Sequence, residues 1–111
     1  MIKPMIPVVL ESPFSGDVET NTRFARACMH DCLMRNEAPF ASHLLYTQPG
    51  VLQDTVPRER ELGINAGFII NARLDKTVVY TNLGISGGMQ LGIDNAIACG
   101  RPVEYRMLEN W

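Results

Sequence analysis

Two short runs of small and hydroxyl-bearing residues are the parts of this sequence whose types and spacing suit ligand chemistry. Glu11-Ser12-Pro13-Phe14-Ser15-Gly16 follows an apolar run, and so does Gly84-Ile85-Ser86-Gly87-Gly88-Met89. Each run leads into a helical pattern. A helix that begins after such a turn presents free backbone N–H groups and the positive end of its dipole, which together bind anions. The two runs therefore predict a site for a nucleoside or a nucleotide.

The candidate contacts within that site differ in their chemistry. Hydroxyl and backbone groups of the two runs suit ribose or phosphate, and otherwise form ordinary turns and helix caps. After the next strand-like segment, His43 suits hydrogen bonds to a base and Tyr46 suits stacking, although His43 could equally be bonded to loop backbone. Glu11 is the candidate catalytic or ribose-binding carboxylate, or else a strand-end acid bonded to neighbouring backbone. The candidate ligand-binding residues are Ser12, Phe14, Ser15, Gly16, His43, Tyr46, Ser86, Gly87, Gly88 and Met89.

Composition limits the classes of function. The chain has 111 residues, which predicts one domain over residues 1–111, and it is 46% apolar and 20% charged, as ordinary globular proteins are. A net charge of −2 without a basic run argues against nucleic acid as a partner. No apolar segment approaches the roughly 18 to 20 residues of a membrane span, and no leader peptide is visible. We therefore expect no membrane partner and a cytoplasmic location. The glycine-rich runs fit neither common dinucleotide nor Walker motifs, and we expect no cofactor and no metal.

The elements that must position these residues alternate between strands and helices. Apolar runs predict strands at 6–10, 39–42, 77–80 and 103–107, and helical spacing predicts helices at 17–35, 57–73 and 86–100. A βαβαβαβ order predicts an α/β fold: a small Rossmann-like parallel sheet of about four strands, in flavodoxin-like order, with helices on both faces. The loop predicted at 43–55 is long for this fold, and such loops are often functional.

This architecture also predicts where a ligand binds. In open parallel sheets the site lies beyond the carboxyl ends of the strands, where the strand order reverses. We therefore expect the turns after the first and third strands to flank a crevice, and residues 42–48 to close one side of it.

The same motifs resemble a known superfamily over nearly the whole chain. The early strand with Ser12-Pro13-Phe14-Ser15-Gly16 precedes a helix that opens Asp17-Val18-Glu19-Thr20-Asn21, and Gly100-Arg101-Pro102-Val103 leads into the final strand. Together with the run at 84–89, this pattern resembles the nucleoside 2-deoxyribosyltransferase-like superfamily. More narrowly, it is similar to small uncharacterised members from phages, prophages and bacteria, which implies one such domain over residues 1–111.

The resemblance implies two functions that depend on one carboxylate. The superfamily uses a Glu that attacks or stabilises the anomeric carbon, and this Glu lies four residues after the glycine of a Gly-Thr-like pair. Gly88-Met89 matches that pair here. Gly92 therefore stands at the position of the Glu. One implied function is a nucleotide- or nucleoside-binding protein, in phages a sponge that sequesters a nucleotide second messenger in the host cytoplasm and counters host defence. The other is an N-glycosidase or deoxyribosyltransferase acting on a nucleoside or nucleoside monophosphate through Glu11 or another displaced acid. A protein-interaction module with a relict crevice is a third reading.

We also expect a homo-oligomer. A small sheet with short edges is poorly covered alone, and small chains often gain stability by assembling. Trp111, at the end of the sequence, is expected to pack on a neighbouring subunit.

Overall fold

The strands form from short runs rich in β-branched residues, and the helices from longer segments with apolar residues three to four apart. A computed structural model describes residues 3–111. In chain order the elements are β1 (Ile6–Glu11), α1 (Val18–Met34), β2 (Glu37–Phe40), α2 (Ser42–Leu45), α3 (Pro57–Asn71), β3 (Lys76–Tyr80), α4 (Gly87–Ala98) and β4 (Val103–Arg106). The predicted α/β class is confirmed.

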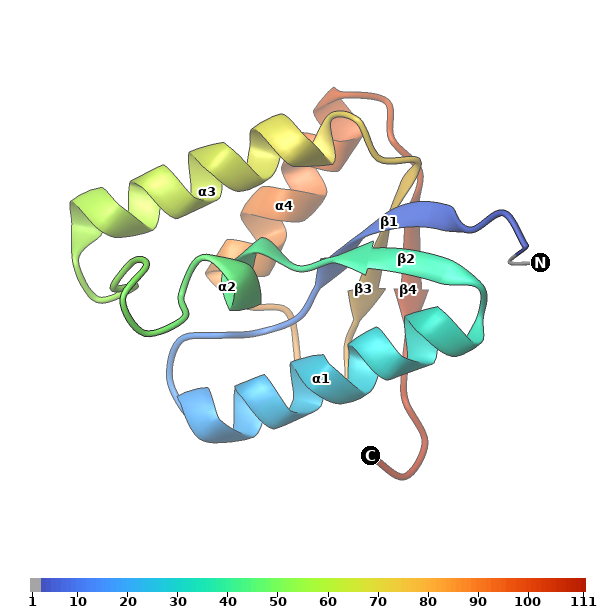
Figure 1. The fold of residues 1–111 in the computed structure, drawn as a ribbon, viewed down its shortest axis with the longest axis horizontal. Helices are drawn as coiled ribbons and strands as arrows, with labels where there is room; N and C mark the ends of the chain where they lie inside the picture. Colours follow the sequence, from blue (N-terminus) through green and yellow to red (C-terminus); the bar gives the residue numbers. More distant parts are fainter. Residues whose placement is uncertain (1–2) are drawn as a thin grey trace.

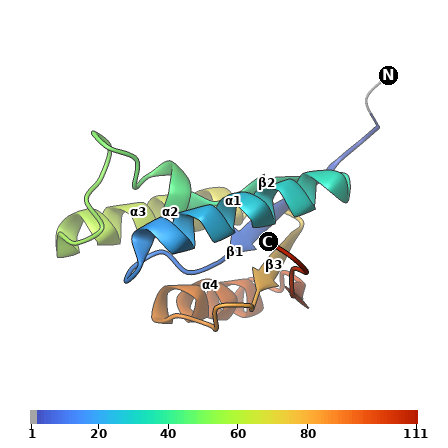
Figure 2. The same cartoon turned by 90° about the horizontal axis from the view of Figure 1, so that it is seen from below.

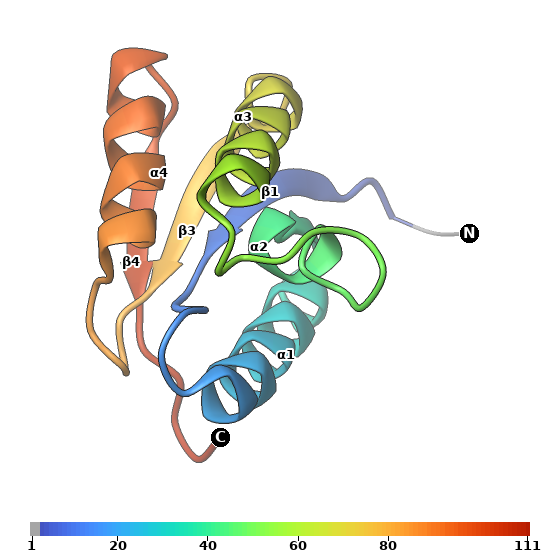
Figure 3. The same ribbon diagram turned by 90° about the vertical axis from the view of Figure 1, so that its left-hand side faces the viewer.

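The four strands form one parallel sheet in the order β2-β1-β3-β4. The chain leaves β1 for β2 on one side and then crosses back to β3 on the other, so the strand order reverses between β1 and β3. Helix α1 covers one face of the sheet, and α3 and α4 cover the other (Figures 1 and 3). The flavodoxin-like order therefore places the turns after β1 and β3 next to each other.

The two faces of the sheet bury different residues. On the α1 face, Phe24, Cys28 and Cys32 pack against the inward side chains of β1 and β3, and all are fully buried. On the opposite face, Met89 and Ile93 of α4 pack against Val79. Figure 2 shows α1 and α4 on opposite sides of the strands. Glu11 and Val79 are register partners, so Glu11 faces the α3 and α4 side.

Local signals in the sequence fix the ends of the helices. Asp17 caps α1, because its carboxylate accepts hydrogen bonds from the N–H and hydroxyl of Thr20 at 3.2 and 2.8 Å. Pro57 is the first residue of α3, a position that needs no N–H donor. Gly100 follows α4 at φ 71°, in the left-handed region where glycine commonly ends a helix. No helix among residues 3–111 is both long and apolar enough to cross a membrane.

Two predictions were wrong in detail. The second strand was predicted at 39–42, but β2 spans Glu37–Phe40, and the segment predicted as loop contains the short helix α2. Strand β2 begins earlier because Glu37 is buried and paired with Arg106. This long-range ion pair allows a charged residue to lie inside the fold. Trp111 packs edge-on against Phe24 of its own chain, with ring centroids 4.7 Å apart, and its contact with a neighbouring subunit stays a prediction.

The Glu37–Arg106 pair is the centre of a buried ionic cluster on the α1 face. Arg106 donates to both Glu37 oxygens at 2.8 and 2.6 Å and to the Tyr80 hydroxyl at 3.0 Å. Lys76 lies 3.1 Å from the same carboxylate. These donors hold the pKa of Glu37 down at about 2. The cluster is satisfied internally and lies away from the crevice described below.

Candidate functional site

A crevice lies beyond the carboxyl ends of β1 and β3, between α3 and α4, as the topology predicts. Its enclosed part has a volume of about 90 Å³. The lining comes from the β1 turn, from α2, from the stretch leading into α3, and from one face each of α3 and α4. The lining residues are Glu11, Ser12, Phe14, Ser15, Ser42, His43, Asp54, Arg60, Ile64, Phe68, Asn71, Ser86, Gly88, Met89 and Gly92.

The structure brings most of the sequence-predicted candidates together in this crevice. Those that line it are Glu11, Ser12, Phe14, Ser15, His43, Ser86, Gly88 and Met89. Three candidates lie outside its lining. Gly16 adopts φ 100° in the turn before α1, Tyr46 lines a smaller neighbouring cavity and packs edge-on against Phe40, and Gly87 faces open space.

Glu11 occupies a notch that exists because position 92 is glycine. A Cβ built on Gly92 would lie 2.5 Å from Glu11 Cδ and closer still to Oε2. The carboxyl group of the strand residue therefore fills the space that a side chain on the helix would take. Burial raises the pKa of Glu11 from 4.5 to about 8, and the positive charge of Arg101 opposes this rise only in part. Glu11 is thus mostly protonated at neutral pH.

Arg101 is the buried cation beneath the crevice. Its guanidinium donates to the Thr77 hydroxyl and the Asn71 main-chain carbonyl at 2.9 Å, and to Asn95 Oδ1 at 3.3 Å. All three acceptors are neutral. The charge of Arg101 is therefore not cancelled by a paired carboxylate, and Glu11 is the acid on which it acts. These bonds join β3, α3 and α4 at the base of the crevice.

Asn71 contributes an unsatisfied amide to the same crevice. The residue is 3% exposed, and its Oδ1 accepts no hydrogen bond from any residue in the described range 3–111. A buried polar atom without a partner costs about 1–3 kcal/mol, and such atoms are rare in folded proteins. An unpaired amide in the wall of a cavity is an observation that a bound ligand would explain.

Ser12 and His43 form a pair on the α2 side of the crevice. Ser12 Oγ and His43 Nε2 lie 2.7 Å apart, which identifies the partner of His43 as a side chain and not loop backbone. Burial lowers the pKa of His43 to about 4, so the imidazole is neutral at pH 7. Neutral imidazole and hydroxyl groups can each donate or accept one further hydrogen bond.

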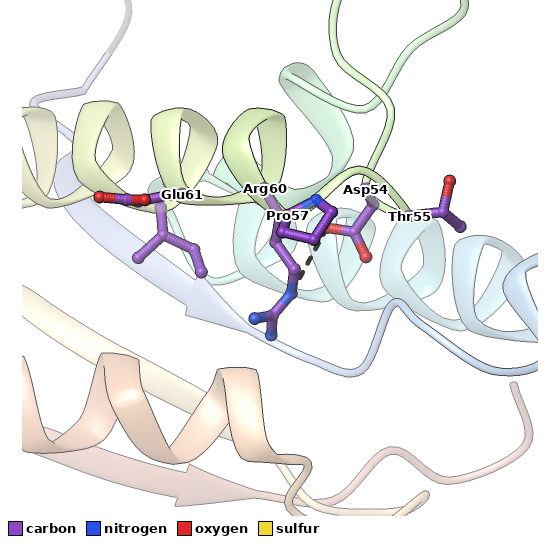
Figure 4. Close-up of a pocket in the computed structure, with 6 residues that line it drawn as sticks. Asp54, Thr55, Pro57, Arg60 and Glu61 are labelled. Atoms are coloured by element: carbon purple, nitrogen blue, oxygen red, sulfur yellow. Dashed lines mark ion pairs between the residues drawn. The ribbon is translucent and has the colours of Figure 1, made fainter.

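The outer end of the crevice holds one cation, Arg60, and the space in front of it is also lined by Asp54 and Glu61. Ser86 caps α4 by accepting from Met89 N at 3.2 Å, which leaves the N–H groups of Gly87 and Gly88 without acceptors among the described residues. Arg60 Nη2 lies 3.6 Å from the position of a Cβ on Gly88. Figure 4 shows Arg60 projecting from α3 across this opening.

Arg60 is only weakly neutralised. Its ion pair with Asp54 has an N–O distance of 3.9 Å, and the side chain is 42% exposed. The space in front of it, of about 380 Å³, shares Asp54, Arg60 and Ile64 with the enclosed crevice. Arg60 and the free first turn of α4 can together hold an anion at this opening.

Arg60, Asp54 and Asn71 are site residues that sequence reasoning missed. Arg60 belongs to the charge run at 58–61, which reads most simply as a solvated helix face. A usable signal was present in the spacing of one α3 stripe, because Arg60, Ile64, Phe68 and Asn71 fall on one side of a helix. That stripe ends in a polar residue at a buried position, which marks the face toward the crevice.

A larger cavity lies elsewhere in residues 3–111. It has a volume of about 640 Å³ between α1, β2 and α2, and its walls are mostly apolar. Phe14 lines both this cavity and the crevice. The smaller crevice is the better functional candidate, because acid, amide, imidazole and guanidinium groups converge there on one space.

Comparison with known proteins places the chain in a family. Residues 6–106 match the family described as Domain of unknown function (DUF7768). The chain belongs to the DUF7768 family. No curated protein and no solved structure matches the chain. The description of the DUF7768 family names no activity, so the chemistry of the crevice is the basis for a functional proposal. Within residues 3–111 no three His, Cys, Asp or Glu side chains are grouped as a metal site requires.

Proposed function

We propose that this DUF7768 protein binds a nucleotide or nucleoside in the crevice and holds it without chemical change, so that it sequesters a nucleotide signal. A nucleotide carries an anionic end and a polar, partly aromatic end. The crevice offers a matching pair of ends, with Arg60 and the first turn of α4 outside and neutral hydrogen-bonding groups inside. Ser12 and His43 add groups suited to ribose hydroxyls.

The observation that carries this proposal is the position of Arg60. A guanidinium with a long, weak ion pair lies against the exposed N-terminus of α4, at the mouth of a cavity whose inner wall contains an unsatisfied amide. Surface arginines without a role lie anywhere on a helix. This one faces the strand-order reversal, where α/β folds bind their ligands.

Binding without turnover suits the state of Glu11. Nucleophilic attack on an anomeric carbon needs an ionised carboxylate. A carboxyl group with a pKa of about 8 is mostly neutral at pH 7, so it is a good hydrogen-bond donor and a poor nucleophile. This supports a binding role ahead of a transferase that forms a covalent intermediate.

The same observation supports one alternative, an N-glycosidase. A protonated Glu11 could act as general acid. In that reaction the C–N glycosidic bond breaks, its electron pair leaves with the base, and Glu11 supplies a proton to the base. Water then adds to the cationic anomeric carbon and gives one proton back to the Glu11 carboxylate. The Glu11 carboxyl fills the space of a Gly92 side chain, so the acid would be supplied from β1 and not from α4.

Mass spectrometry on a ligand panel tests the proposal. The protein is incubated with nucleosides, monophosphates, NAD, ADP-ribose and cyclic nucleotides, separated and denatured, and both fractions are analysed. We expect one compound to be retained intact. Arg60→Gln should weaken retention of a phosphorylated ligand at least tenfold, whereas Arg58→Gln, on the same helix outside the crevice lining, should not.

Two other results would change the conclusion. Release of free base at a rate proportional to protein, abolished in Glu11→Gln, would establish the glycosidase. Retention of no compound together with release of no free base would contradict both functions and favour an interaction module.

A further inference from the structure

The inner end of the crevice combines two polar groups that the fold itself does not use. The Asn71 amide and the Glu11 carboxyl both line it, one from the last residue of α3 and the other from the last residue of β1. Asn71 Oδ1 is buried and unpaired. Glu11 forms no ion pair within residues 3–111, and the Arg101 guanidinium is already bonded to neutral acceptors.

The surroundings of these two groups make a narrow slot with one aromatic wall. Gly92 presents no side chain toward Glu11, and Phe68 lies one helical turn before Asn71 in the same lining. Arg101 fixes the Asn71 backbone by its bond to the main-chain carbonyl at 2.9 Å. The amide can exchange its oxygen and nitrogen by a half-turn of the side chain, so either group can face the slot.

We propose that Asn71 and Glu11 read the hydrogen-bonding edge of a neutral heterocycle, which fixes a nucleoside or nucleotide with its base inward and its sugar or phosphate toward Arg60. This rests on the proposed function and specifies the base as the group that the inner end recognises. A carboxamide pairs with adjacent donor and acceptor atoms on a base edge, as Asn does in reading adenine. A neutral carboxyl offers the same donor and acceptor set, whereas an ionised one only accepts.

The chemistry of the slot favours the orientation with the base inside. A phosphate placed inside would lie near the Glu11 carboxyl and away from the first turn of α4, which is the outer anion-binding position. A base placed inside can supply a partner to Asn71 Oδ1 once a half-turn of the amide brings that oxygen to the slot. Sites built to bond a polar group reject analogues that lack it far more strongly than apolar pockets reject a changed methyl group.

Calorimetric titration with matched nucleosides tests this inference. Adenosine, cytidine, guanosine and uridine are compared with their edge-blocked counterparts N6,N6-dimethyladenosine, N4,N4-dimethylcytidine, 1-methylguanosine and 3-methyluridine. We expect the blocked form of whichever nucleoside binds to be at least tenfold weaker. Asn71→Leu should cause a loss of similar size while the variant remains folded by circular dichroism.

Glu11→Gln separates edge recognition from a catalytic or structural role. Glutamine keeps a donor and an acceptor but cannot ionise, so the comparison isolates the effect of carboxyl ionisation on affinity. The ratio of wild-type to Glu11→Gln affinity should then fall about tenfold between pH 7 and pH 9, as the carboxyl with a pKa of about 8 ionises. Taking the ratio cancels any ionisation of the ligand.

Other charged groups near Glu11 do not produce this ratio. Arg101 lies beneath it, His43 faces it from α2, and Asp54 and Arg60 lie at the outer end. All four are unchanged in the variant. Glu109→Gln, which removes an exposed carboxylate in the C-terminal tail, is the matched control and should behave as wild type.

The outcomes distinguish this inference from the function on which it rests. Base-inward recognition would be overturned, and nucleoside binding left intact, if nucleosides bind but three results are negative. Edge blocking and Asn71→Leu would leave the affinity unchanged, and the ratio of wild-type to Glu11→Gln affinity would not change with pH. A chain that binds none of the nucleosides or nucleotides overturns both.

Discussion

The stability of this protein should depend on pH in an unusual way, because Glu11 and His43 shift in directions that oppose each other. The pKa of Glu11 rises from 4.5 to about 8 on folding, so the folded state binds the extra proton between these values. Its contribution is fully present below pH 4.5 and is lost as pH rises through 8. The pKa of His43 falls from 6.5 to about 4. Its contribution is present above pH 6.5 and is lost as pH falls toward 4.

The magnitude follows from proton linkage at about 1.4 kcal/mol per pH unit for one proton. Between pH 4.5 and 6.5 the two slopes cancel, and the free energy of unfolding should be nearly flat. Between pH 6.5 and 8 only Glu11 contributes, so the free energy of unfolding should fall by about 2 kcal/mol. Glu11→Gln should remove that fall and instead show a rise of about 3 kcal/mol from pH 4.5 to 6.5, due to His43.

Urea unfolding at five pH values between 4.5 and 8 measures this directly. His43→Gln should give the complementary result, a continuous fall over the whole range. Glu109→Gln serves as the control for loss of an exposed carboxylate and should follow wild type. Parallel curves for wild type and Glu11→Gln above pH 6.5 would refute the burial of a protonated Glu11.

Three further predictions concern the supports of the crevice and the fold. Gly92→Ala should displace the Glu11 carboxyl from its notch and lower the pKa of Glu11 by at least one unit, measured by side-chain carboxyl NMR; an unchanged pKa would contradict the notch. Arg101→Met should raise the pKa of Glu11 further, because a positive charge is removed. It should also lower the free energy of unfolding by about 3 kcal/mol in urea titrations, because buried acceptors lose their donor. No loss of stability would contradict the supporting role of Arg101. Glu37→Gln should destabilise the fold by about 3 kcal/mol, because it removes the buried carboxylate that Arg106 and Lys76 share and leaves the more exposed Glu104 as the ion-pair partner of Arg106; thermal unfolding measures this, and a loss under about 1 kcal/mol would show that the pair is dispensable.

Much of the fold could be predicted from local patterns. The β-branched run before Tyr80 and the caps at Asp17, Ser86 and Gly100 are local signals that placed strands and helix ends within a few residues. The alternation of strands and helices then fixed the parallel sheet. The start of β2 could not be predicted, because burial of Glu37 depends on a partner 69 residues away along the chain.

The candidate site divides in the same way. Residues in the turns after β1 and β3 could be predicted to converge, because parallel topology brings the carboxyl ends of neighbouring strands together. Arg60 and Asn71 reach the crevice from α3, and their contribution depends on how this helix is rotated about its axis against the sheet. The contact of Glu11 with Gly92 depends on side-chain packing between a strand and a helix, which no spacing along the sequence encodes.

The most direct test of the central claim is chemical-shift mapping of a retained nucleotide on isotope-labelled protein. We expect chemical-shift changes at the Asn71 side-chain amide and at the backbone amides of Glu11, Ser12, Gly88 and Gly92, in proportion to bound ligand. Shifts confined to the larger apolar cavity between α1, β2 and α2, with the crevice amides unmoved, would contradict it.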